Sequence, residues 1–146
     1  MFLSRPLILA GTLVEDLNIE FRDGVAVSVT AAKGQALFEH LIWSDDGARR
    51  LGEIGLVPHS SRVSRSGTLF YNALFDGNAA SHVTFGQSHA VCLAAGIGSA
   101  KSPPETGANH SSIHIDCMLG NSEMDVDGIR TSGAVEPIMR GGEFVI

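Results

Sequence analysis

The stretch His114-Ile115-Asp116 is a place in this sequence where two side chains of different chemistry could bind one metal ion. On a β-strand, residues two apart point to the same face, so the His114 imidazole and the Asp116 carboxylate would lie side by side. Both groups are common ligands of divalent metals. A surface histidine beside a solvated aspartate gives the same pattern, so this motif alone does not establish a metal site.

Two further residues have surroundings that are unusual for their type. His82 lies in the segment AASHVTFG, whose small and apolar residues indicate a buried backbone, and a buried histidine must hydrogen-bond or bind something. Glu53 lies in the segment LGEIGLV, and glutamate is rarely buried without a partner. The alternatives are a hydrogen-bonded core histidine and a glutamate at a strand end that faces water.

These two imidazoles and two carboxylates together would suit zinc, cobalt or manganese, with water completing the coordination. Such a metal lowers the pKa of its bound water and polarises a carbonyl group, which is the chemistry of peptide hydrolysis. Two histidines with one carboxylate are also the ligand set of non-haem iron oxygenases, so iron-dependent redox chemistry is an alternative. Spacing along the chain does not establish that the four residues meet in space.

Strands are expected to position most of these groups. Alternating apolar residues on both sides of an Asp-Gly pair at 23–24 predict a hairpin over residues 17–31. Further strands are expected over residues 54–57, 81–85 and 112–118, with a last hairpin that has turns at 126–128 and 130–133. The Gly-, Ser- and Pro-rich stretch 96–109 is expected to be a loop.

Helical spacing of apolar residues changes the pattern over residues 34–43. That helix is expected to end near Gly47, which can take the left-handed cap conformation, and a short second helical piece is expected over residues 48–51. Together with the strands, this predicts a strand-rich α+β fold with β-hairpins and one clear helix. The length of 146 residues fits a single domain, residues 1–146.

Composition narrows the classes of partner. Hydrophobic residues make up 44% of the chain and charged residues 18%, as in a folded globular protein. The net charge is -6 and Lys and Arg form no run, which argues against nucleic-acid binding. The apolar segment 6–14 is too short to span a bilayer and does not look like a signal peptide, so a cytoplasmic protein without membrane contact is expected. Cys92 and Cys117 form no C-x-x-C pair, which excludes a zinc ribbon.

Several blocks of the sequence resemble one family. The chain is similar to the carboxy-terminal part of the aminopeptidase T, aminopeptidase S and PepS family of thermophilic-type metalloaminopeptidases. The matching blocks are RPL at 5–7, GARRLGE at 47–53, LFDGNAASH at 74–82, HID at 114–116 and DVDGI at 125–129. Their order and separation agree throughout, and the likeness covers nearly the whole chain.

The resemblance implies a metal-dependent aminopeptidase acting on peptides or small molecules. The family's metal ligands fall on Glu53, His82, His114 and Asp116. Family members dimerise through this region, so a homodimer or higher homo-oligomer is expected.

The chain departs from the family pattern at several points. Family members are more than twice as long, and an acidic motif that supplies a metal-binding glutamate and the general base precedes the part matched here. A further family ligand, a glutamate, falls on Gly77. The family's catalytic tyrosine falls on His89, which could replace it as a hydrogen-bond donor or as an acid–base group, because histidine titrates near neutral pH. The changed set favours one metal over two and leaves a non-catalytic metal-binding module as a third alternative.

Overall fold

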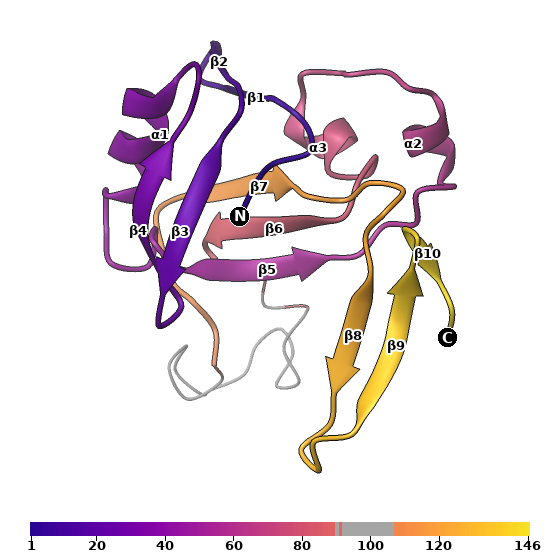
Figure 1. The fold of residues 1–146 in the computed structure, drawn as a ribbon. Coiled ribbons are helices and arrows are strands. Elements are labelled where there is room, and N and C mark those ends of the chain that lie inside the picture. Colours follow the sequence, from indigo (N-terminus) through magenta and orange to yellow (C-terminus); the bar gives the residue numbers. More distant parts are fainter. Residues whose placement is uncertain (90, 92–106) are drawn as a thin grey trace.

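The computed structural model describes residues 1–89, 91 and 107–146 (Figure 1). Within these residues the chain is strand-rich, with four small antiparallel sheets and three helices, which is consistent with the predicted α+β class. The strands are β1 (Leu7–Leu9), β2 (Thr12–Val14), β3 (Asn18–Arg22), β4 (Val25–Thr30), β5 (Leu51–Gly55), β6 (His82–Gly86), β7 (His114–Met118), β8 (Val126–Ile129), β9 (Val135–Arg140) and β10 (Glu143–Phe144). The helices are α1 (Gln35–Ile42), α2 (Arg62–Arg65) and α3 (Ala73–Asp76).

The hairpin predicted over residues 17–31 is confirmed as β3 paired with β4. Its turn lies at Asp23 and Gly24, whose φ angles are 51° and 74°. This positive pair is the conformation that an Asp-Gly turn favours and that matches the twist of the two strands. The helix predicted over residues 34–43 is confirmed as α1.

The chain after α1 differs from the prediction. The helix ends at Ile42, ahead of the expected stop near Gly47, and the expected second helical piece is a turn, the bridge residue Arg50 and the first residue of β5. The backbone N–H of Ala48 donates to the Asp45 carboxylate at 2.7 Å, and the carbonyl of Arg49 accepts from Ala26 of β4 at 2.9 Å. Because this segment hydrogen-bonds to a side chain and to a strand, it does not continue the helix.

Two other predicted boundaries differ from the structure, and one predicted loop lies mostly outside the described residues. Strand β5 begins at Leu51, three residues before the predicted strand, so Glu53 lies inside it. Residues 126–128 belong to strand β8 and not to a turn, because they pair with β9, whereas the turn at 130–133 is confirmed. Most of the predicted loop 96–109 lies outside the described residues.

The central sheet has the order β5-β6-β7. Figure 1 shows α1 and the β3–β4 hairpin near one end of this sheet, whereas the β8-β9-β10 sheet extends from the other end. None of the described helices is long and apolar enough to cross a membrane.

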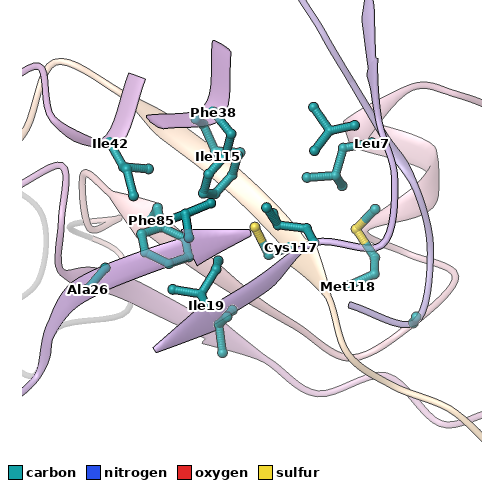
Figure 2. Packing of buried hydrophobic residues seen from close by; sticks show 14 residues of the cluster. Leu7, Ile19, Ala26, Phe38, Ile42, Phe85, Ile115, Cys117 and Met118 are labelled. Carbon is teal, nitrogen blue, oxygen red and sulfur yellow. The ribbon is translucent and has the colours of Figure 1, made fainter. Parts of the chain in front are cut away.

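Phe85 of β6 joins the central sheet to the elements beside it. Its ring is completely buried, stacks on Phe21 of β3 with centroids 5.6 Å apart, and meets Phe38 of α1 edge-on at 5.7 Å. Ile115 and Cys117 of β7 belong to the same buried cluster (Figure 2). The core therefore covers one face of the sheet and fixes its orientation against α1 and the hairpin.

Candidate metal centre

The register of the central sheet places the candidate ligands on the face opposite the core. Glu53 lies directly across from Thr84, and Thr84 lies across from Asp116. Side chains two apart on a strand share a face, so His82 joins Thr84 and His114 joins Asp116. The core face of the same strands carries Val83, Phe85, Ile115 and Cys117, all of them buried. Alternation thus separates the chemistry from the packing.

Backbone carbonyls orient both strand histidines. The Nδ1 of His114 lies 2.8 Å from the carbonyl oxygen of Gln87, and the Nδ1 of His82 lies 3.2 Å from that of Ala80. A carbonyl oxygen only accepts, so each Nδ1 is the donor, and in the neutral imidazole Nε2 then carries the lone pair. Histidines that bind metals are held in this way.

The two free Nε2 atoms each approach a carboxylate. His82 Nε2 lies 3.9 Å from Glu53 Oε1, and His114 Nε2 lies 3.5 Å from Asp116 Oδ1. The Glu53 and Asp116 side chains are 18% and 17% exposed, so both remain reachable from solvent. Neither carboxylate is turned fully outward into water.

His89 lies at the same face, after the end of β6. Its Nδ1 lies 2.6 Å from Glu53 Oε2, and its ring centroid lies 4.5 Å from that of His114. Among the described residues, Glu53, His89 and His114 form a group whose ligand atoms all lie within 4.8 Å of one another. His82 and Asp116 flank this group through Glu53 and His114, and are not part of it.

Thr84 is a site residue that sequence reasoning missed. It is completely buried, and its hydroxyl donates to Asp116 Oδ1 at 2.6 Å. The bond fixes one oxygen of that carboxylate beside His114. A signal was available, because Thr84 is two residues from His82 on the same strand and therefore shares its face.

Asp45 fastens the chain where it enters β7. Its Oδ2 accepts from the backbone N–H of Ser112 at 2.9 Å and from the hydroxyls of Ser112 and Ser111 at 2.8 and 3.0 Å. These bonds to Ser112, with those from Ala48 and Ser111, hold the pKa of the Asp45 carboxyl far below its usual range. These hydrogen bonds hold the backbone at Ser112, two residues before His114.

Glycines allow close approaches around the site. A Cβ at Gly55 would lie 2.4 Å from Cε1 of the His82 imidazole, which packs over this glycine. A Cβ at Gly47 would lie 1.8 Å from the carbonyl oxygen of His110. Gly47 is therefore required for close packing and not, as the sequence suggested, for a helix cap.

Cys117 and Asp76 lie near the candidate ligands without joining them. Cys117 is completely buried on the core face, and burial raises the pKa of its thiol. Asp76 is 2% exposed and accepts from the backbone N–H groups of Phe70 and Asn72 at 3.0 and 2.9 Å. Cys117 therefore belongs to the core, and Asp76 holds the backbone of its own loop, so neither is a candidate ligand.

The donor set of nitrogen and carboxylate oxygen atoms on one rigid, solvent-reachable face fits a first-row divalent cation. This arrangement is typical of proteins that bind a metal ion through histidines and carboxylates on neighbouring β-strands.

Comparison with known proteins identifies the family. Residues 1–144 match the family model described as thermophilic metalloprotease (M29), and the chain belongs to this metallopeptidase family. Over 143 residues it is 47% identical to aminopeptidase T of Thermus aquaticus, and over 144 residues it is 38% identical to aminopeptidase PepS of Streptococcus thermophilus. Each match covers 98% of this chain and 35% of the relative, so the chain spans about a third of the length of these relatives.

A solved structure agrees with this assignment. Wild-type AmpT from Thermus thermophilus superposes with a TM-score of 0.91 and is 42% identical. The superposition covers all of this chain and 36% of that one. The resemblance predicted from the sequence blocks is therefore confirmed.

Proposed function

We propose that this chain is a metal-dependent, aminopeptidase-like hydrolase domain in which Glu53, His82, His114 and Asp116 hold a divalent cation. The observation that carries the proposal is that all four side chains, with His89, lie on one face of the sheet and are linked by close contacts. Zinc, cobalt and manganese suit this donor set. A bound cation would lower the pKa of a coordinated water and polarise the carbonyl of a peptide substrate.

Other residues of the site would orient the ligands and exchange protons with the substrate. The Thr84 hydroxyl orients Asp116, and the carbonyl of Gln87 orients His114. Both ligands are therefore held in place before a cation binds. His89 occupies the place of the family's catalytic tyrosine, and its imidazole donates to Glu53. With 56% of its side chain exposed, His89 can also exchange a proton with a substrate group at the open side of the site.

The chain spans about a third of the length of its relatives, so peptide hydrolysis by this chain is itself part of the proposal. The proposal also includes a single metal ion, a homo-oligomer and a cytoplasmic location. Residues 1–146 would act as one metal-binding unit. Sedimentation of the pure protein at several concentrations tests the oligomer, and a monomer throughout would remove that part.

The test of function combines metal analysis with an assay. Purified protein is analysed for bound metal and then assayed on aminoacyl-nitroanilides with zinc, cobalt or manganese. We expect metal-dependent release of nitroaniline that His82→Ala abolishes. His40→Ala, which changes an exposed histidine on α1, is the matched control and should keep full activity. Bound metal without turnover would favour a non-catalytic module, and no bound metal would end the proposal.

A second candidate function is a mononuclear non-haem iron oxygenase on the same scaffold. The observation that favours it is the group of Glu53, His89 and His114, because two imidazoles and one carboxylate are the ligand set of such oxygenases. Oxygen uptake by the iron-loaded protein would support this function. Tight zinc occupancy with no oxygen uptake under iron would exclude it.

A further inference from the structure

We propose that His89 is itself a metal ligand and, together with Glu53 and His114, binds the first-row divalent cation of the proposed site. The inference rests on the proposed function, because it concerns the same metal ion. It goes further by assigning a ligand at the position where the family resemblance implies a tyrosine. His82 and Asp116, the other two ligands of the proposed function, flank this group through Glu53 and His114.

Hydrogen bonds at the end of the central sheet fix the position of His89. Beyond the end of β6, the backbone N–H of Gln87 donates to the carbonyl of Ile113 at 2.8 Å, and that of Ser88 donates to the carbonyl of Asn109 at 3.1 Å. The Ser88 hydroxyl also accepts from the backbone N–H of Asn109 at 2.9 Å. These bonds tie the segment before His89 to the chain that leads into β7. The His89 ring therefore emerges beside the His114 ring.

One short segment serves both histidines. The carbonyl of Gln87 accepts from His114 Nδ1 at 2.8 Å, which leaves the Nε2 of His114 as its ligand atom. Two residues later, His89 directs its Nδ1 at Glu53 Oε2 at 2.6 Å. The three ligand atoms lie within 4.8 Å of one another. A cation bound by His89 Nδ1 would replace this hydrogen bond, and the imidazole would then carry its proton on Nε2.

The ligands differ in how exposed they are to solvent and therefore to a substrate. Glu53 is 18% exposed, His114 30% and His89 56%, so the ligands become more accessible from the sheet outward. A hydrogen bond between an exposed histidine and a carboxylate adds little stability by itself, so ligation and simple pairing predict different effects of substitution.

The experiment compares cobalt and zinc binding by the full chain carrying His89→Gln, His114→Ala or His40→Ala. Glutamine keeps an N–H donor for Glu53 and loses the imidazole, so it separates pairing from ligation. The loss of a partner outside the coordination shell weakens binding about 10- to 100-fold. We therefore expect His89→Gln to weaken cobalt binding by more than about 100-fold, and the X-ray absorption spectrum of the zinc form to lose one imidazole. His40→Ala should bind as the wild type does.

The outcomes separate the inference from the proposed function. If His89→Gln binds cobalt like the wild type, with an unchanged imidazole count, while His114→Ala does not bind, the inference is overturned and the metal site stands. If the wild type binds neither cobalt nor zinc, both proposals fail. Circular dichroism of each metal-free variant checks that it is folded, so that weakened binding is assigned to the lost side chain.

Discussion

Replacing Thr84 by valine tests whether the buried hydroxyl holds the Asp116 carboxylate for metal binding. Valine keeps the shape of threonine and removes the donor, whose bond to Asp116 is 2.6 Å long. A hydrogen bond to a charged group contributes about 1.5–3 kcal/mol. Because Asp116 is 17% exposed and water can partly replace the hydroxyl, we expect a loss of about 1–2 kcal/mol in the free energy of unfolding. For a chain of this length that is about 3–8 °C in melting temperature.

The effect on metal affinity is the more specific readout. Losing a partner outside the coordination shell weakens metal binding about 10- to 100-fold, so zinc titration of Thr84→Val should lie in this range. Thr84→Ser restores the hydroxyl and removes a methyl group, so it should lose about 1 kcal/mol of stability and keep the affinity. Thr30→Val, at an exposed position of β4, should change neither. Equal zinc affinity in Thr84→Val and the wild type would refute the orienting role of this hydroxyl.

Three further predictions concern the scaffold of the site. Gly86 has a φ of 92° and an added Cβ would lie 2.3 Å from a carbonyl oxygen, so Gly86→Ala should lower the melting temperature markedly more than Gly67→Ala, which has a φ of 64° and open space. Hydrogen bonds lower the pKa of Asp45, so its stabilisation is complete above about pH 4 and is lost as the pH falls further. Urea unfolding should therefore find Asp45→Asn less stable than the wild type at pH 7 with a shrinking difference in acid, and the fully exposed Asp46→Asn close to the wild type at both. The buried thiol of Cys117 has a raised pKa, so iodoacetamide at pH 8 should leave it unmodified in the folded protein and alkylate it in urea, as read by peptide mass.

Local patterns predicted the local parts of this fold. The Asp-Gly turn and its flanking alternation determine the β3–β4 hairpin, and apolar spacing determines α1, because each depends on residues close in sequence. The shared face of His114 and Asp116 was predictable for the same reason, since it needs only strand alternation.

The non-local parts were harder to predict. Glu53 faces Thr84 because β5 carries an irregularity between Leu51 and Glu53, which shifts its register against β6. No pattern within residues 51–55 contains that information. The role of Gly47 was misassigned for a related reason, because its neighbour in space, His110, lies far along the chain. The prediction that the candidate ligands converge came from the family resemblance, because spacing along the chain could not provide it.

The division of the sheet into two faces also explains why the candidate ligands differ in how firmly they are held. Glu53, His82, His114 and Asp116 lie on strands whose opposite face is packed against a buried core, so their backbone cannot shift without disturbing that core. His89 lies beyond its strand; in the described part of the chain the hydrogen bonds of Gln87 and Ser88 tie the backbone before it, and its ring contacts Glu53 and His114. A cation bound by His89 would therefore order a group that the core leaves adjustable. The strand residues would supply most of the preorganisation, and His89 would follow the metal.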